Sequence, residues 1–363
     1  MKKVCLMSGA VINAGDFLIE KRSLALIKHF LPDVETTVLN RVTNDYSNRI
    51  EQLNSFDAII FSGGPLYQPG LYRKGIPFVS PEIIHDVKPP VFFVGGGIHQ
   101  NYYTCSYSPL DKLFYEKGIQ GDNSMGCRDI FTVKYLKHIG YPAMLTGCPA
   151  WYDLEYVDKT ELISHNPGTI NNICVSEPGD VRNVELLLGL LEHLRKRYPD
   201  AKITLVIHRD KLKDMMTQLP VLKNKFGIDT VNISGTVEGF SIYNDCDLHV
   251  GFRVHAHIYN LSRRNLTILF NEDIRGLGVN TTLGLDNINV ESVPYGQRKL
   301  YGQYYLIRYH SGYNMRNAAG WMFDDYMDST IERGFQNYNE AFKKMNSYFN
   351  NMGLFFKRIN NSI

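Results

Sequence analysis

The sequence predicts an α/β protein with two Rossmann-like domains, each built on a parallel sheet that helices cover on both faces. Its 363 residues exceed what one hydrophobic core usually supports. Short apolar runs alternate with amphipathic helical patterns along most of the chain, which is typical of parallel sheets. This alternation stops once, near the middle, and then starts again.

In the first half, each predicted strand is a short apolar run and each predicted helix has apolar residues at helical spacing. The predicted strands are residues 3–7, 36–39, 57–61, 90–94, 126–128 and 143–146. The predicted helices are residues 17–30, 47–53, 110–117 and 131–139. We therefore expect an N-terminal domain over residues 1–155.

Periodicity is lost between residues 152 and 172, where Asp, Asn, His, Pro and Gly accumulate, and we interpret this stretch as the interdomain linker. A second domain is expected over residues 170–290. Its predicted strands are residues 173–176, 203–207, 230–233, 248–251 and 267–270, and its predicted helices are 184–198, 212–225, 239–244 and 255–262. The remaining residues, 291–363, form an aromatic-rich tail that ends in two predicted helices over 322–356.

Composition excludes several classes of protein. Lys and Arg total 39 against 37 acids, an excess too small for a bulk nucleic-acid binder. The six cysteines form no C-x-x-C pair, which favours reduced, buried thiols in a cytoplasmic protein. No stretch approaches the roughly 20 apolar residues of a membrane span, so we expect a soluble protein. The aromatic content of 12% leaves peripheral contact with a membrane open.

Small-residue turns follow three predicted strands of the first half, where open α/β sheets bind ligands. Asn13, Gly15 and Asp16 open the first helix, whose N–H groups favour anions, although a helix cap without a ligand explains them equally well. The other two turns suggest a ligand at this edge, with tight packing as the alternative. Their glycines are Gly63, Gly64, Gly95, Gly96 and Gly97. None matches G-x-G-x-x-G, so no dinucleotide is predicted.

The sharpest candidate site follows the predicted strand 248–251 and opens a helix. Arg253 is placed to hold a carboxylate or phosphate with its bidentate fork. His255, two residues later, is placed to exchange a proton or to donate to the same anion. We interpret His257 as structural. No carboxylate or third histidine lies at metal-ligand spacing, so no metal is predicted.

Three further groups are candidates with open alternatives. Arg128 and Asp129 open another helix and either hold substrate or form an ion pair that orders the helix start. His208 and Arg209 follow the predicted strand 203–207 as a second anion contact. The group after the last strand reaches a polyhydroxyl ligand or closes a salt-bridge network; it contains Asn271, Glu272, Asp273 and Arg275.

At these residues the chain resembles the polysaccharide pyruvyl transferase family, from residue 1 to about residue 285. The segment Gly251-Phe252-Arg253-Val254-His255 is similar to the family's G-x-R-[LV]-H element. The other similar segments are Asn13-x-Gly15-Asp16, the glycine turns at 63–64 and 95–97, Arg128-Asp129 with Gly140, Asp273-Ile274-Arg275 and Leu283-Gly284-Leu285.

The resemblance implies a glycosyltransferase-B-like pair of Rossmann domains. It also implies transfer of a pyruvyl group from phosphoenolpyruvate to two hydroxyls of a sugar, which forms a ketal in a surface glycan or its lipid-linked precursor. Arg253 and His255 would bind phosphoenolpyruvate, which puts the donor on the C-terminal domain and the acceptor on the N-terminal one. A lipid-linked acceptor would place the protein at the inner face of the membrane. The scheme requires no cofactor and no metal.

This chemistry assigns roles to the candidate residues. Phosphoenolpyruvate carries a carboxylate and a phosphate, so its site needs at least two cationic binding groups. Arg253 with His255 would supply one group, and Arg128 or Arg209 would supply another. His255 serves as general acid, and Asp16 is the hypothetical base for the sugar hydroxyl.

The chain departs from the family pattern at two positions. Cys148 stands where the family often has an aspartate, and Thr132 where it often has a serine. Two alternatives therefore stay open: a nucleotide-sugar-dependent glycosyltransferase on the same fold, and a non-catalytic protein that binds glycan in an assembly complex. Cys148 favours the non-catalytic alternative slightly, and Arg253 with His255 favours retained anion binding.

Overall fold

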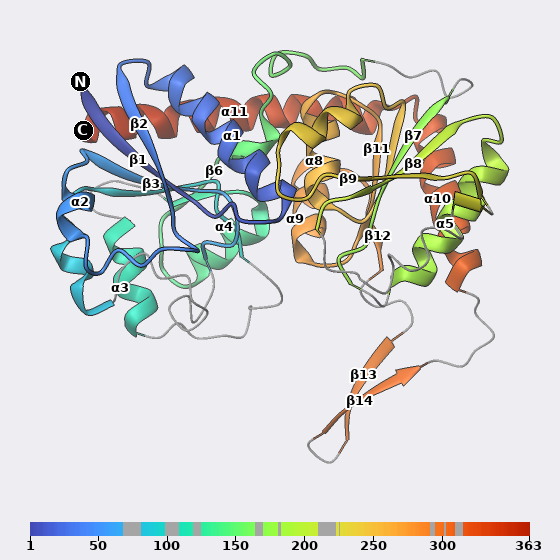
Figure 1. Ribbon diagram of the computed structural model, residues 1–363, viewed down its shortest axis with the longest axis horizontal. Coiled ribbons are helices and arrows are strands. Elements are labelled where there is room, and N and C mark those ends of the chain that lie inside the picture. Colours follow the sequence, from blue (N-terminus) through green and yellow to red (C-terminus); the bar gives the residue numbers. More distant parts are fainter. Residues whose placement is uncertain are drawn as a thin grey trace.

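The computed structural model describes residues 1–67, 81–98, 109–118, 125–163, 170–180, 183–209, 223–224, 226–290, 295–300, 303–308 and 315–363. Two parallel sheets lie one after the other along the long axis, and a C-terminal helix runs beside both (Figure 1). We call the parts built on the first and second sheets the N-terminal and C-terminal domains. Helices and strands alternate within both, as the sequence predicts.

The N-terminal sheet has the order β2-β1-β3-β4, and all its strands are parallel. The strands are β1 (Lys2–Ser8), β2 (Val34–Asn40), β3 (Ala58–Ser62) and β4 (Val91–Val94). A second parallel pair, β5 (Met125–Cys127) and β6 (Ala143–Leu145), continues beyond β4 through a bridge between Gly96 and Cys127. The helical elements are α1 (Ala14–Phe30), α2 (Ile50–Asn54), α3 (Pro109–Gly118), α4 (Ile130–His138) and the 3-10 helices η2 (Pro81–Asp86) and η4 (Pro149–Trp151).

The C-terminal sheet has six parallel strands in the order β12-β11-β10-β7-β8-β9. These are β7 (Asn172–Ser176), β8 (Lys202–Ile207), β9 (Asp229–Asn232), β10 (Leu248–Gly251), β11 (Thr267–Asn271) and β12 (Ile288–Asn289). The helices are α5 (Val184–Arg197), α8 (Val254–Ser262), α9 (Ile274–Leu283) and the 3-10 helix η6 (Glu238–Tyr243). The strand order reverses direction between β7 and β10, which creates a crevice at their carboxyl ends.

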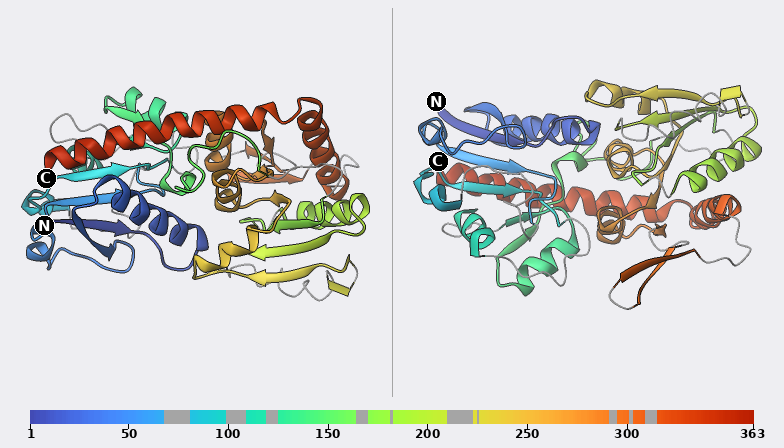
Figure 2. Two further views of the ribbon diagram at one scale, coloured as in Figure 1. Left: turned by 90° about the horizontal axis from the view of Figure 1, so that it is seen from above. Right: turned by 60° about the horizontal axis from the view of Figure 1, so that its bottom comes forward.

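The tail contains more than the two helices predicted from sequence. An antiparallel hairpin, β13 (Tyr295–Leu300) with β14 (Gln303–Arg308), comes first. Helix α10 (Met315–Glu332) then packs on α5, and α11 (Gln336–Ser362) returns along both domains, so that the two chain ends lie close together (Figures 1 and 2). Asn346 accepts a hydrogen bond from Arg264 at 2.8 Å, and Asn351 donates to the Leu145 carbonyl at 3.0 Å. Helix α11 therefore ties the two domains together.

The predicted linker is packed at its start. Trp151 and Tyr152 are almost fully buried and belong to an apolar core that continues into the C-terminal domain and α11. Asp153 accepts hydrogen bonds from Arg22 of α1 at 2.5 Å and from Arg263 at the end of α8 at 3.1 Å. Burial opposes ionisation of Asp153, yet these two cations hold its pKa below the usual range. The domains are therefore joined by a core and an ion-pair triad.

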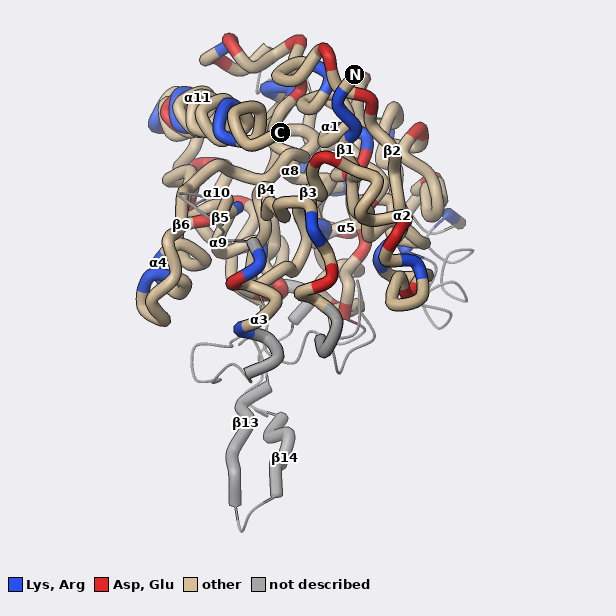
Figure 3. The backbone as a smooth tube through the Cα atoms, turned by 90° about the vertical axis from the view of Figure 1, so that its left-hand side faces the viewer, with Lys and Arg blue, Asp and Glu red and all other residues tan. Residues whose placement is uncertain are grey.

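The structure agrees with some of the remaining sequence predictions and differs from others. The five cysteines of the described ranges are buried, as predicted, and Cys105 lies outside those ranges. The predicted helix over 239–244 is a 3-10 helix, and most of the predicted helix over 212–225 lies outside the described residues. No helix in the described ranges is long and apolar enough to cross a membrane. Lys and Arg residues are interspersed with Asp and Glu residues along the chain (Figure 3).

Candidate active site

A pocket lies between the two domains, where the start of α1 meets the starts of α8 and α9. Asn13 comes from the N-terminal domain, and the other lining residues follow β8, β10 and β11 of the C-terminal domain. The lining residues are Asn13, His208, Phe252, Arg253, Val254, His255, Glu272, Asp273 and Arg275. Seven of the candidate residues named from the sequence are thus brought together at the carboxyl edge of the second sheet.

Arg253 lies at the mouth of the crevice between β7 and β10. Gly251, just before it, has a φ of 149° and lies so close to the Ser176 backbone that a Cβ there would overlap it. The Arg253 N–H donates to Ser176 Oγ at 3.0 Å, and its Nη2 donates to Glu177 Oε1 at 2.5 Å. Nε is buried without a partner. The guanidinium is therefore anchored at one nitrogen and keeps donors for a ligand.

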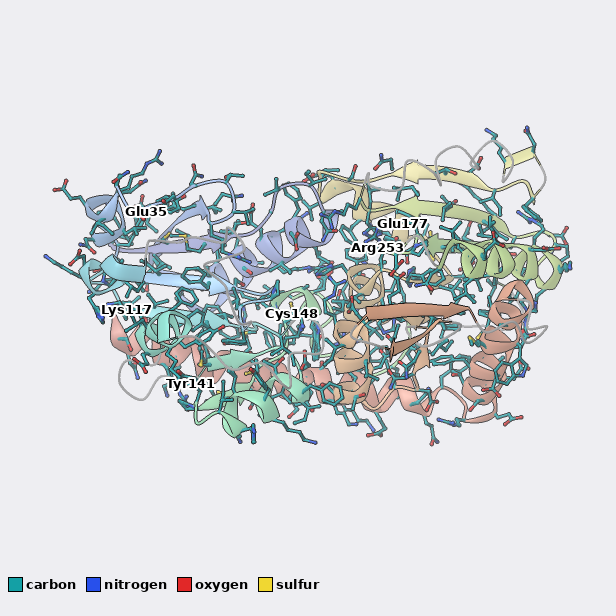
Figure 4. All side chains as sticks on the ribbon, turned by 90° about the horizontal axis from the view of Figure 1, so that it is seen from below. Glu35, Lys117, Tyr141, Cys148, Glu177 and Arg253 are labelled. Carbon is teal, nitrogen blue, oxygen red and sulfur yellow. The ribbon has the colours of Figure 1, made fainter. Side chains whose placement is uncertain are left out.

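Glu177 is the residue that fixes this arrangement, and the sequence analysis missed it. It is fully buried, follows β7 directly, and lies beside Arg253 in the part of the C-terminal domain that is nearer the N-terminal domain (Figure 4). It also accepts the backbone N–H groups of His208 at 2.9 Å and Arg209 at 3.2 Å. Burial raises the pKa of Glu177, while Arg253 opposes the shift. The rule that singled out Arg253, a charged residue just beyond the carboxyl end of a buried strand, also finds Glu177.

His255 occupies the first turn of α8 and lies against Gly15 of α1. A Cβ on Gly15 would overlap the imidazole ring, so only glycine lets the two helix starts approach this closely. Burial, together with the charges of Arg275, Arg128 and Arg253, lowers the pKa of His255 to about 3. The imidazole is therefore neutral at pH 7 and faces a strongly cationic environment.

Asn13 and Asp16 bring the N-terminal domain to the pocket. Asn13 caps α1 by accepting the Gly15 N–H at 3.3 Å, and its amide donates to Asp16 Oδ2 at 3.3 Å. Burial raises the pKa of Asp16, against the charges of Arg41, Arg275 and Arg209. The Asp16 carboxylate therefore lies within electrostatic reach of guanidinium groups from both domains.

Several candidates are held by other protein groups. Asp273 caps α9 and pairs with Arg275 at 2.6 Å, so the salt-bridge interpretation applies to this pair, although both residues line the pocket. Glu272 also lines the pocket, but its carboxylate accepts the N–H of Gly179 at 2.6 Å and the amide of Asn183 at 2.7 Å. Asn271 donates to Asn287 at 2.8 Å.

Arg128 does not line the pocket. Its Nε pairs with Asp129 at 2.9 Å, its Nη2 donates to the Ile98 carbonyl at 2.7 Å, and the guanidinium lies on Gly97. The alternative in which Arg128 orders the helix start is therefore the one that fits, and this arginine acts on His255 only through its charge.

Packing also explains two of the glycines. A Cβ on Gly63 would overlap Ile19, and one on Gly96 would come within 2.9 Å of Leu66 and Tyr67. At these two positions the contacts fit the packing alternative, and the ligand interpretation stays a prediction. Gly64, in contrast, lies beside the Arg41 guanidinium, 3.4 Å from where its Cβ would be.

The remaining predicted residues have distinct environments. His208 is buried in the pocket wall, where its Nε2 lies 2.7 Å from Tyr243 Oη and its Nδ1 has no partner. Arg209 has a buried Nε without a partner. His257 bonds Thr267 and Asn280, each at 2.9 Å, which confirms its structural role.

Cys148, which stands where the family often has an acid, is buried in the N-terminal domain near the boundary (Figure 4). Burial raises the pKa of its thiol to about 11, so it carries no charge at neutral pH. Among the described residues, no group of three or more His, Cys, Asp or Glu side chains has the arrangement of a metal site.

Solved structures with a similar fold support the two-domain architecture. MnaA from S. aureus, solved with UDP, superposes with a TM-score of 0.58 at 13% identity, over 99% of this chain and 95% of its own. The UDP-GlcNAc 2-epimerase of Neisseria meningitidis, bound to UDP-GlcNAc, gives 0.56 at 11% identity, over 99% of both chains. At such identities the likeness concerns the fold alone, and it confirms the predicted glycosyltransferase-B-like arrangement.

Sequence comparison identifies the family. No curated protein matches the chain. The family model described as polysaccharide pyruvyl transferase matches residues 13–259, which include α1, the strands from β2 to β10, and the Arg253–His255 element. The chain therefore belongs to the polysaccharide pyruvyl transferase family.

Proposed function

We propose that this protein transfers the pyruvyl group of phosphoenolpyruvate to two hydroxyls of a glycan sugar, which forms a cyclic ketal and releases phosphate. One observation supports this most directly: Arg253 and His255 share an interdomain pocket with Asn13 and Arg275. The donor would bind to the C-terminal domain, and the acceptor would enter from the N-terminal domain. We take residues 1–155 and 170–290 as these domains and 291–363 as the tail that joins them.

The pocket has the donors that a small polyanion needs. Arg253 Nη1 has no acceptor among the described residues, and Arg275 uses only Nε and Nη2 for Asp273. The N-terminus of α8 starts at the same place and favours negative charge. A carboxylate and a phosphate can therefore each meet a guanidinium, without a metal ion to neutralise them.

The reaction balances with the groups present. A proton adds to C3 of phosphoenolpyruvate, and a sugar oxygen bonds to C2 and loses its proton. The second hydroxyl then bonds to C2 as the C2–O bond to phosphate breaks, and its proton leaves with the phosphate. Both carbon–oxygen bonds of the ketal come from the sugar, and no oxidant or reductant is needed.

His255 and Asp16 are assigned to the two proton transfers. Burial and three arginines oppose the charge of His255 and keep it neutral. A bound trianion offsets these arginines and raises the pKa of His255, so that it can carry the proton for C3. Asp16, near the donor pocket and raised in pKa by burial, is the proposed base for the sugar hydroxyl.

Ligand-dependent stability tests the donor. Phosphoenolpyruvate at 100 times its Kd should stabilise the protein by about 2.7 kcal/mol, whereas UDP and GDP should not. Arg253→Gln should abolish this shift, and Arg49→Gln, an exposed arginine of the N-terminal domain, should keep it. Stabilisation by UDP or GDP in place of phosphoenolpyruvate would show a nucleotide-sugar enzyme instead.

Turnover tests the reaction. Release of inorganic phosphate from phosphoenolpyruvate should depend on a sugar diol acceptor and should be lost in Arg253→Ala. If Asp16→Asn keeps full turnover while Arg253→Ala has none, Asp16 is not the base. A lipid-linked acceptor would bring the protein to the inner face of the membrane, and we include such acceptors in the same assay.

A further inference from the structure

Arg41 is a buried arginine that the donor pocket does not use. It directly follows β2, is 5% exposed, and does not line the donor pocket. Its side chain makes no hydrogen bond or ion pair with any residue of the described ranges, and its Nε is enclosed without a partner. The terminal Nη atoms are not fully enclosed. A ligand can therefore reach the end of this guanidinium.

The position of Arg41 matches that of a ligand site. Its Nη2 lies 2.9 Å from where a Cβ on Gly9 would be, and 3.4 Å from that of Gly64. Gly9 follows β1, and Gly64 follows β3 after one residue. The strand order β2-β1-β3-β4 reverses direction between β1 and β3, so Arg41 lies at the switch point of the first sheet, where open α/β sheets bind ligands.

The charges around Arg41 favour the binding of an anion. Burial lowers its pKa, and Asp16 is the one carboxylate of the described residues whose charge counters that shift. The charges of Arg275 and Arg209 also act on Asp16, so the carboxylate of Asp16 does not serve Arg41 alone. A buried guanidinium without hydrogen-bond partners is costly, and a bound oxyanion removes that cost through charge-assisted hydrogen bonds.

We propose that Arg41 forms an anion subsite for the acceptor, and hence that the acceptor carries a carboxylate or phosphate group close to the hydroxyls that react. This inference rests on the proposed function, because it takes the C-terminal pocket as the donor site. The charges of Arg41 and of Arg275, which lines the donor pocket, both act on Asp16. Asp16 is therefore close enough to both sites to serve as the base for the acceptor hydroxyl. The shared chemistry is an oxyanion on a sugar, supplied either by a uronate or by a sugar phosphate.

Binding of three matched sugars tests the subsite. Protein saturated with phosphoenolpyruvate is titrated in a calorimeter with methyl glucoside, glucuronate and glucose 1-phosphate. At least one anionic sugar should bind tenfold or more tightly than the neutral one. Arg41→Gln should weaken that binding at least tenfold, and Arg41→Lys less, since it keeps the charge and loses the planar fork. Arg49→Gln should change nothing. The preferred anion identifies uronate or phosphate as the source.

The outcomes separate this inference from the donor assignment. Equal binding of neutral and anionic sugars, no binding of either anion to the wild type, or unchanged binding in both Arg41 variants would overturn it. Phosphoenolpyruvate affinity should be the same in wild type and Arg41→Gln, and thermal unfolding checks that each variant is folded. If anionic sugars need Arg41 but phosphoenolpyruvate never binds, the subsite stands and the proposed donor fails.

Discussion

The imidazole of His255 lies against the Cα atom of Gly15, so the first turn of a helix from each domain meets at one point. Two more contacts fix this junction: the Ala14 N–H donates to the His208 carbonyl at 3.3 Å, and the Gly235 N–H to the Ile12 carbonyl at 2.7 Å. The site therefore exists only when the domains are docked. Its geometry depends on glycine at position 15, because any side chain there would overlap the imidazole ring.

Gly15→Ala tests this contact. The added methyl group overlaps the ring and forces His255 or α1 to move, at a cost of about 1–3 kcal/mol, typical of overpacking. We expect phosphoenolpyruvate affinity to fall about tenfold or more, measured by calorimetry. Gly353→Ala in α11, where the nearest atom is the flexible Phe30 ring at 3.1 Å, is the matched control. Unchanged affinity in Gly15→Ala would mean that the ring position does not matter for binding.

Glu177→Gln should weaken donor binding without direct contact to the donor. The amide keeps the shape of the side chain but loses the charge that anchors Arg253 at 2.5 Å. We expect at least a tenfold rise in the Kd for phosphoenolpyruvate and a lower midpoint of thermal unfolding, because a buried cation loses its partner. Glu35→Gln, at an exposed site far from the pocket, serves as control (Figure 4). A thermal effect with an unchanged Kd would leave Glu177 a purely structural role.

Donor binding should take up protons through His255. Burial and the charges of Arg275, Arg128 and Arg253 lower its pKa to about 3, and a bound trianion raises this pKa by offsetting those charges. At pH 7.5, where a phosphate group is already mostly dianionic, calorimetry in two buffers of different ionisation enthalpy should show uptake of part of a proton. His255→Gln should abolish it. The same uptake in the variant would assign the proton to another group.

His257 should make stability depend on pH. Burial lowers its pKa to about 4, against about 6.5 in an unfolded chain. Above pH 6.5 neither state binds the proton; between 6.5 and 4 only the unfolded state does, so the free energy of unfolding falls by about 1.4 kcal/mol per pH unit. At pH 5 the loss is about 2 kcal/mol from this residue alone.

Urea unfolding of wild type and His257→Gln at pH 7.5, 6 and 5 measures this contribution. The variant loses its bonds to Thr267 and Asn280 at every pH, but its pH slope should be smaller by one proton. The contribution of His257 is the difference in pH slope between the two proteins. The slope of either protein alone is not enough, because the raised pKa values of Glu177 and Glu272 change the free energy of unfolding with pH in the opposite direction. His138→Gln, exposed on the surface, should keep the wild-type slope.

Asp153→Asn should weaken the contact between the domains and lower the stability of the protein. The variant leaves Arg22 and Arg263, 14% and 19% exposed, without their shared anion. Breaking a buried pair in this way costs about 3–5 kcal/mol, and these partly exposed cations should put the loss at the lower end. We expect a lower urea midpoint than in wild type and in Asp33→Asn, an exposed control. Equal midpoints in all three proteins would show that the triad adds nothing to stability.

The alternating architecture and the main site element follow from the amino-acid sequence alone. Buried parallel strands must be continuous apolar runs, so strands such as β3 and β4 are visible in the chain. Arg253 and His255 are identified because open α/β sheets bind ligands beyond the carboxyl ends of buried strands. The same rule fits Glu177, which directly follows β7. Arg41 follows the edge strand β2, whose side chains are half-buried or exposed, so the rule does not select it.

Which of the candidate residues come together depends on how the two domains pack. Arg128 and Gly96 follow strands just as Arg253 does, yet one is held by Asp129 and the other packs against Leu66 and Tyr67. The contact of His255 with Gly15 joins residues 240 positions apart. Such pairings depend on how two sheets dock across a shared core and α11, and side-chain patterns along one strand or helix carry no information about that docking.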